Sequence, residues 1–401
     1  MSAISETKTP QHLGRYVLLL WLIVTIVTVY NQYPRLADWD LGDNDNFMRL
    51  HQIALFLQNG EWFQKPLADF NPQDGRIIHW SRLADLPVAG MIVLLDKVMV
   101  HSQSTLWSVA IVPALYGALF LFAITQYTAL MFSRKVALAA LVFLPLTVGY
   151  SKFMPGSIDH HNLQLMLFAS FLALVPFHRL DKVTDLKALF AGLILALSLL
   201  IGLESLPFYF GYLLTALLYN EYPPERYSRR TLAYIAMSAG IIGLFGLFTL
   251  EPVEYVLTPQ FDIASYPLFI LIFVAGLSCW FHRDTDTIWP LFLTIVVLTL
   301  PILLRFPNVI HSPFHNYPNL LIEYWLNHVT EAVSLWDKLN MDTVKPSSWV
   351  ALLSFVAPLL SIFVLHTRAQ KVQYLLFVIS LVPVLFWQTR ASTYSLIFAI
   401  P

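Results

Sequence analysis

Apolar segments long enough to cross a lipid bilayer, or nearly so, recur along the whole of this chain. They are apolar on all sides, whereas a helix of a soluble core carries one apolar stripe and one polar face. Hydrophobic residues make up 57% of the sequence and charged residues only 12%, and the mean hydropathy is +0.63. These features predict an all-α polytopic membrane protein with about eleven transmembrane helices. The expected spans are residues 15–30, 105–132, 136–150, 162–177, 187–203, 206–219, 231–249, 264–281, 287–304, 348–366 and 372–388.

Three further features narrow the class of protein. The first apolar segment has no small-residue cleavage signature, so we expect it to be retained as a helix. The single cysteine, Cys279, lies in an apolar segment and can form no internal disulfide. The formal net charge is −1 and no basic block indicates a nucleic-acid partner. Membrane lipids are the expected surroundings of most of the surface.

Basic residues fall in alternate connections between the expected spans. Lysines and arginines near span ends are retained on the cytoplasmic side. The short loops opposite hold Lys152 and almost no other basic residue. The N-terminus is therefore expected inside, with two long external loops at residues 31–104 and 305–347. The basic connections contain Arg134, Lys135, Arg179, Lys182, Lys187, Arg226, Arg229, Arg230, Arg283, Arg368 and Lys371.

The first external loop carries four aspartates ahead of an amphipathic segment. Asn44 or Asp45 is expected to cap this helix by accepting its free N–H groups, and Gly60 is expected to end it. A cap accounts for one acid and leaves the others unexplained. A helix start also favours an anion, or a phosphate bridged through a metal, nearby.

The triplet Asp159, His160 and His161 stands directly before another apolar run. One interpretation is interfacial, with Asp159 as a helix cap and both imidazoles among lipid headgroups. Alternatively, a carboxylate and an imidazole at positions i and i+2 both turn toward one divalent cation, which leaves His160 for a phosphate or a supporting hydrogen bond. The set becomes sufficient for a cation if the first loop donates an acid and a substrate donates oxygens.

The late external loop carries a third group of acids, Glu323, Glu331 and Asp337. Taken alone, this stretch is typical of a surface helix that packs Trp325 against the membrane face. All three acid-bearing stretches are nevertheless predicted on the same side of the membrane. We therefore expect them to contribute to one site.

This order of motifs resembles the membrane-embedded catalytic subunit of archaeal and bacterial oligosaccharyltransferases, and the wider GT-C glycosyltransferase fold. The first loop of those enzymes carries a D-x-aromatic element, which Asp45, Asn46 and Phe47 match, with Asp43 as an alternative acid. The resemblance implies a GT-C-type bundle over residues 1–401. The family's W-W-D-Y-G element does not occur in this sequence, so we expect its soluble C-terminal domain to be absent or truncated, and we do not expect protein N-glycosylation.

The later motifs of the family also have counterparts. The second motif varies among D-x-D, E-x-D, D-N-E and D-H-H, and Asp159 and His161 look like its two metal-side positions. The S-V-S-E or T-I-x-E element is loosely matched by V-T-E-A, which contains Glu331. A late arginine of the family meets the lipid-linked pyrophosphate, and Arg390 is its plausible counterpart. A lone arginine at a span end also simply snorkels to the headgroups.

The resemblance implies an inverting transfer from a polyprenyl-phosphate or polyprenyl-pyrophosphate donor to a protein, lipid or glycan acceptor. Asp45, Asp159 and His161 would hold Mn²⁺ or Mg²⁺, with Zn²⁺ also admitted by the histidine. Asp45 or Glu331 would orient the acceptor or take its proton. Donor phosphate oxygens would meet Arg390, His160, Arg82 and His79.

Two other functions compete with this prediction. A transporter or flippase of lipid-linked glycans places ionisable residues near the bilayer midplane, whereas the expected spans here are nearly free of charge. A transferase that uses a polyprenyl-monophosphate sugar to modify a lipid or cell-wall glycan shares the same fold. We expect a bacterial inner-membrane protein with its active face toward the periplasm.

Overall fold

The computed structural model describes residues 13–63, 80–221, 226–311, 317–329, 331–340, 349 and 352–400. Within these ranges the chain forms α-helices joined by turns and short 3-10 helices, and contains no strand. The α-helices are α1 (Leu13–Ala37), α2 (Asn44–Asn59), α3 (Arg82–Leu95), α4 (His101–Met131), α5 (Arg134–Phe143), α6 (His161–Leu174), α7 (Asp185–Ile201), α8 (Leu206–Asn220), α9 (Arg226–Leu250), α10 (Val253–Leu257), α11 (Tyr266–Phe281), α12 (Trp289–Arg305), α13 (Asn319–Tyr324), α14 (Leu335–Leu339), α16 (Val356–Leu360), α17 (Arg368–Phe386) and α18 (Ser392–Ala399).

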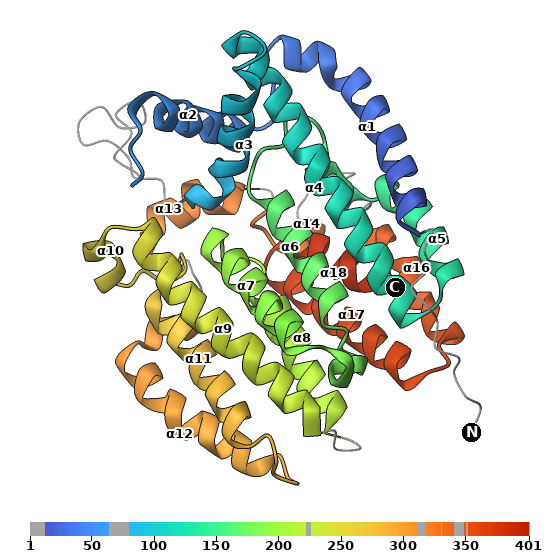
Figure 1. Ribbon diagram of the computed structural model, residues 1–401, viewed down its shortest axis with the longest axis vertical. Coiled ribbons are helices and arrows are strands. Elements are labelled where there is room, and N and C mark those ends of the chain that lie inside the picture. Colours follow the sequence, from blue (N-terminus) through green and yellow to red (C-terminus); the bar gives the residue numbers. More distant parts are fainter. Residues whose placement is uncertain are drawn as a thin grey trace.

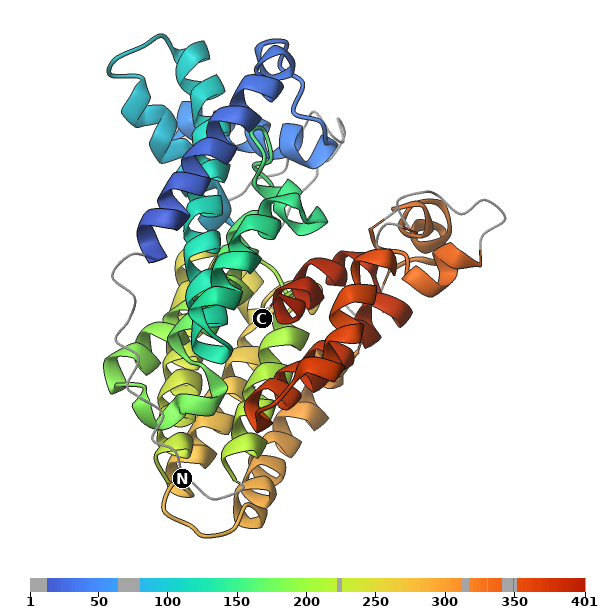
Figure 2. The ribbon, with the colours of Figure 1, turned by 90° about the vertical axis from the view of Figure 1, so that its right-hand side faces the viewer.

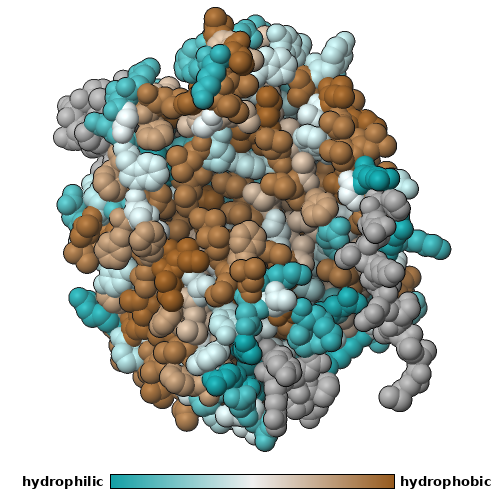
Figure 3. All heavy atoms as spheres, viewed as in Figure 1, coloured by the Kyte–Doolittle hydropathy of each residue, from teal (hydrophilic) through white to brown (hydrophobic). Residues whose placement is uncertain are grey.

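The protein is an integral membrane protein. Four described helices, within α1, α4, α9 and α17, are long and apolar enough to span a bilayer. With 31 residues, α4 is about 46 Å long, so it extends beyond a hydrocarbon core of about 30 Å. Hydrophobic side chains spread over the middle of the face in Figure 3. Exposed apolar residues line α1, α12 and α17, for example Leu18, Leu22, Ile26, Leu293, Val297, Leu300, Leu375, Ile379 and Val382.

Small residues bring α9 close to its neighbours. This helix packs against α7 and α11, and the three run side by side in Figure 1. A Cβ added at Gly240 would lie 2.6 Å from the Phe273 Cβ, and one at Gly276 would lie 2.7 Å from the Met237 nitrogen. Glycine lets the backbones approach, which is a common basis of helix association in lipid.

Helices α2 and α3 lie at one end of the bundle, beside the upper half of α4 in Figures 1 and 2. Helices α2, α3 and α4 share a small apolar core that includes Ile53, Val88, Ile92 and Val109. The larger core runs through α4, α6, α7, α8, α17 and α18. The N-terminus of α6, which follows the acid and two imidazoles, lies where these two cores meet.

Several expectations about single elements can now be compared with the structure. Asp43, and not Asn44 or Asp45, caps α2 by accepting from the Asp45 N–H at 3.2 Å, while Gly60 ends the helix at φ +67° as expected. The apolar segment 136–150 leaves the α-helical conformation after Phe143 and continues as 3-10 turns. Eleven spans and two long loops remain a prediction.

Candidate functional site

One buried amide joins the first external loop to the triplet that precedes α6. The Asn46 Oδ1 accepts from the backbone N–H groups of Ile158 and Asp159, both at 2.9 Å. The Asn46 Nδ2 donates to the Leu41 carbonyl at 3.1 Å. Because Asp43 supplies the cap of α2, the Asp45 carboxylate is left for other interactions. The start of α2 and the start of α6 are thus held together.

The carboxylate of Asp159 lies between the two imidazoles. Its Oδ2 is 3.3 Å from His161 Nε2, and its Oδ1 is 2.6 Å from His160 Nδ1. The other nitrogen of His160, Nε2, is 3.3 Å from Glu204 Oε1. Since each ring nitrogen of His160 faces a carboxylate, this imidazole links Asp159 and Glu204, whereas the Nε2 of His161 faces Asp159 and Glu331.

Glu331 and Arg390 complete this cluster from two distant segments. The Glu331 Oε1 lies 3.7 Å from His161 Nε2 and 3.5 Å from Arg390 Nη2, and its Oε2 lies 3.6 Å from Lys152 Nζ. Arg390 Nη1 is also 3.7 Å from Glu204 Oε1. The two segments pair through their backbones, because the Arg390 N–H donates to the Glu331 carbonyl and the Thr389 N–H to the Val333 carbonyl.

Asp45 is exposed but interacts electrostatically with Asp159, Glu331 and His161. Partial burial raises the pKa of Asp45, and so do the negative charges of Asp159, Asp43 and Glu331. Asp45, Asp159, His161, Glu331 and Arg390 therefore lie around one site, as the topology argument expected.

The charges of this cluster shift the pKa values of its acids and of one imidazole. Burial by itself would raise the pKa of Asp159, but His160, His161 and Arg49 hold it well below its usual range. The neighbouring His161 lowers the pKa of Glu331 to about 2, against the effect of burial. Burial lowers the pKa of His160, yet Asp159 and Glu204 outweigh it and raise this pKa to about 9.

The donor set fits a divalent cation. One ligand atom from each of Asp159, His160 and His161 lies within 4.8 Å of the others. The 3.3 Å between Asp159 Oδ2 and His161 Nε2 suits two neighbouring ligands at about 2.1 Å from one ion. His160 is the weakest ligand of the three, because both of its nitrogens already face carboxylates. Oxygen-rich donors with one imidazole are typical of Mn²⁺ or Mg²⁺ sites and also admit Zn²⁺.

A buried ion network connects α2 and α3 to Asp159 of the site. Arg49 of α2 is fully buried and places Nη1 2.7 Å from Asp85 Oδ1 and Nη2 3.7 Å from Asp159 Oδ1. Arg82 Nη1 lies 3.0 Å from Asp85 Oδ2. The guanidinium of Arg49 also stacks over Trp80, 4.8 Å from the ring centroid. Arg82, expected to bind phosphate, is thus engaged inside this network. His79, with the same expected role, and Thr330 of the V-T-E-A motif lie outside the described residues.

Three charged residues of the cluster were not predicted from the sequence. Glu204 stands alone between two apolar segments, and its only signal was that an acid lies in such a short turn. Arg49 has the spacing of a solvent-facing residue on an amphipathic helix. Its partner Asp85 lies 36 residues further along, and no local pattern connects them.

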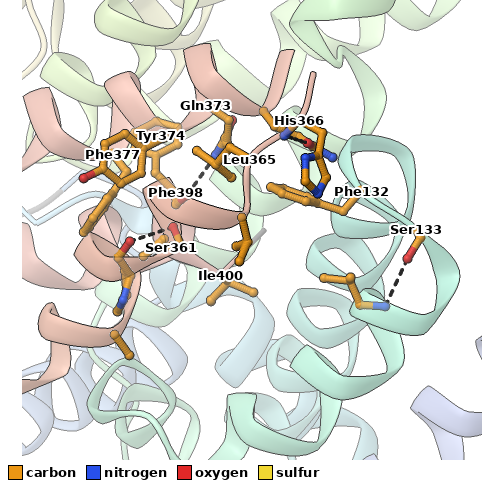
Figure 4. Close-up of a pocket in the computed structure, with 16 residues that line it drawn as sticks. Phe132, Ser133, Ser361, Leu365, His366, Gln373, Tyr374, Phe377, Phe398 and Ile400 are labelled. Carbon is orange, nitrogen blue, oxygen red and sulfur yellow. Dashed lines mark hydrogen bonds between the residues drawn. The ribbon is translucent and has the colours of Figure 1, made fainter. Parts of the chain in front are cut away.

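Two cavities are relevant to ligand binding. One of about 310 Å³ opens beside Asp159 and His161 and is described below. A second, of about 560 Å³, lies between the α4–α5 turn and the helices α16 to α18, as Figure 4 shows. Phe132, Phe377 and Phe398 line this second cavity, together with His366 and Gln373. Its lining contains none of the site residues named above.

The chain has the fold of the membrane oligosaccharyltransferases, as the motif order predicted. Residues along 97% of this chain superpose on 50% of the archaeal oligosaccharyltransferase AglB from Archaeoglobus fulgidus, in complex with an inhibitory peptide and a dolichol-phosphate, with a TM-score of 0.63 and 15% identity. The Archaeoglobus fulgidus oligosaccharyltransferase tethered to an acceptor peptide with the NVT sequon gives 0.62 and 14%, over 97% of this chain and 49% of that one.

A third solved structure, the Archaeoglobus fulgidus oligosaccharyltransferase in complex with Zn and sulfate, gives a TM-score of 0.57 at 15% identity, over 95% of this chain and 48% of that one. The chain thus spans about half the length of the solved structures it matches. No family model and no curated protein matches the sequence.

Proposed function

We propose that this protein is an oligosaccharyltransferase-like membrane glycosyltransferase. It would move a sugar or oligosaccharide from a polyprenyl-phosphate or polyprenyl-pyrophosphate donor to an acceptor at the external face. The observation that carries the proposal is the convergence of Asp45, Asp159, His161, Glu331 and Arg390 on one site within this fold. The similar solved structures hold a dolichol-phosphate, an acceptor peptide, and Zn with sulfate, which are the ligand classes that this arrangement of charges suits.

The reaction follows from the placement of these charges. A nucleophilic O–H or N–H of the acceptor attacks the anomeric carbon, the bond from that carbon to the phosphate oxygen breaks, and the phosphate leaves with the electron pair. Attack opposite the leaving group inverts the anomeric centre. Arg390 binds the phosphate oxygens, and the exposed carboxylate of Asp45 takes the acceptor's proton, with Glu331 as the alternative.

Asp45, Asp159 and His161 would hold the divalent cation, Mn²⁺ or Mg²⁺ with Zn²⁺ as an alternative. Such an ion neutralises the negative charge that develops on a leaving phosphate. The role of His160 and Glu204 is to hold Asp159 and Arg390 in place through the contacts described above. The positions of basic residues favour a cytoplasmic N-terminus and a site on the periplasmic side of a bacterial inner membrane.

Turnover of a polyprenyl-pyrophosphate glycan in lipid nanodiscs, with and without Mn²⁺, tests the proposal. We expect Asp45→Asn, Asp159→Asn and His161→Ala each to lose both Mn²⁺ binding and turnover. Asp185→Asn is the matched control, because Asp185 is exposed and pairs with Arg230 at the start of α7. Unchanged Mn²⁺-dependent turnover in all three site variants would contradict the proposed site.

A further inference from the structure

A polar cavity of about 310 Å³ opens beside the Asp159 and His161 pair. We propose that this cavity is the acceptor subsite, and that it takes a single anionic saccharide unit, phosphorylated or carboxylated, carried on a membrane lipid. This inference rests on the proposed function and adds to it a class of acceptor.

The cavity joins the proposed reaction centre to the end of the first membrane helix. Asp159, His161 and Asn162 line it from the start of α6, and both His161 and Asn162 are buried. Gln32 and Arg35 line it from the last turns of α1. The remaining lining residues are Leu41, Gly42, Asp43, Asn46, Ser151, Lys152, Met154, Pro155 and Ser157.

Two cations line the cavity. The Arg35 Nε lies 3.1 Å from Asp40 Oδ2, and its Nη1 donates to Gln32 Oε1 at 2.8 Å. Gly42, at φ +75°, lets the guanidinium lie against the backbone, because a Cβ there would collide with Arg35 Nη2. Lys152 pairs with Glu331 and is about one-third exposed. Asp40 and Gln32 thus orient the guanidinium, which stays about half exposed, and both cations line the same cavity.

The position of the cavity indicates the acceptor side of the reaction centre. Arg390 and Glu204 lie close to each other and contact Glu331 and His160, and neither is in the described lining of the cavity. An inverting transfer needs the acceptor and the leaving phosphate on opposite sides of the anomeric carbon. If Arg390 binds the leaving phosphate, the cavity is where the attacking group enters.

The lining indicates what kind of acceptor fits. The amide of Gln32 and the hydroxyl of Ser157 suit the hydroxyl groups of a sugar. The two cations suit a phosphate or a carboxylate. The volume is near the lower limit for small-molecule sites, so one sugar unit fits and an extended peptide does not. Because α1 is an apolar helix of spanning length and Arg35 is in its last turn, the opening lies at the level of lipid headgroups.

The step balances without a further reagent. A hydroxyl of the bound saccharide forms the new C–O bond to the donor's anomeric carbon and passes its proton to Asp45. The bond from that carbon to the polyprenyl-linked phosphate oxygen breaks, and the phosphate keeps the electron pair.

Binding of glucose 6-phosphate to the full chain in nanodiscs, without any donor, is the direct test. We expect it to bind more tightly than glucose or inorganic phosphate. Arg35→Gln and Lys152→Gln should each raise its Kd by about tenfold to a hundredfold, since each removes a charge-assisted contact. Gln32→Trp, a change on an exposed turn of helix that fills the cavity, should abolish binding. Lys97→Gln, at an exposed lysine of the same external loop, is the matched control and should bind as wild type does.

Nanodiscs that contain phosphatidylinositol test whether the anionic saccharide is carried on a lipid or is free in solution. Competition by this lipid, and none by phosphatidylcholine, supports a lipid-borne saccharide, whereas competition by an acidic peptide instead overturns the assignment. Equal binding of glucose 6-phosphate by wild type and Arg35→Gln also overturns it. If Asp159→Asn loses donor turnover while wild type and Arg35→Gln bind glucose 6-phosphate equally well, the acceptor subsite is rejected and the proposed transferase function is retained. Normal binding with no donor turnover in the wild type would reject the proposed function.

Discussion

Replacing Asp85 by asparagine should destabilise the protein more than any substitution on its surface. Asp85 is fully buried, and its carboxylate oxygens lie 2.7 Å from Arg49 Nη1 and 3.0 Å from Arg82 Nη1. At an effective dielectric of about 20, one such pair with charge centres about 4 Å apart is worth about 4 kcal/mol. Loss of one partner from a buried ion pair typically costs about 3–5 kcal/mol, because the other charge stays buried without compensation. We expect Asp85→Asn to lower the free energy of unfolding by this amount.

Equilibrium unfolding in mixed micelles, titrated with a denaturing detergent, measures the effect. The control is Asp185→Asn, whose exposed pair with Arg230 should contribute little to the free energy of unfolding. The triple variant Arg49→Met, Arg82→Met and Asp85→Leu should lose less stability than Asp85→Asn, since it removes all three charges of the network. A free energy for Asp85→Asn within 1 kcal/mol of the wild type would refute the structural role of the network.

Three further predictions concern other parts of the molecule. Burial and a neighbouring arginine lower the pKa of His178 to about 4, so the unfolded chain binds a proton more readily than the folded one. The free energy of unfolding should therefore fall as the pH is lowered from about 6.5 toward 4, and His178→Phe should remove this dependence. Asn46→Ala leaves two backbone N–H groups without their acceptor; it should cost at least about 2 kcal/mol and weaken Mn²⁺ binding measured by calorimetry. Gly276→Val should force α11 away from α9 at Met237 and cost about 1–3 kcal/mol, which thermal unfolding would detect.

The sequence predicted the membrane class and the residues of the site, but it did not predict the buried residues that hold the site residues in place. Apolar runs depend only on local composition, so they indicated a membrane protein directly, while the sidedness that the basic residues indicate stays a prediction. Asp159 and His161 stood out because polar groups are costly beside apolar segments. The motif order added Asp45, Glu331 and Arg390, and the structure brings all five together.

Interactions between distant residues were beyond local patterns. Asp43 and Asp45 are equally good caps by composition, and only the backbone geometry of α2 decides that Asp43 accepts the hydrogen bond. Helix α3 was not predicted, because its short apolar stretch lies within a polar loop. Its residues Arg82 and Asp85 form an ion network with Arg49, and this network forms only when α2 packs against α3.

The backbone pairing of Glu331 and Val333 with Thr389 and Arg390 couples two segments thermodynamically. A donor phosphate bound to Arg390 would stabilise the ordered conformation of the late loop. By reciprocity, any ligand that orders Glu331 would raise the affinity for the donor by the same factor. Hydrogen exchange of residues 331–340 should therefore slow when a polyprenyl-pyrophosphate binds. The exchange rate of the loop that carries Glu331 would then indicate whether the donor is bound.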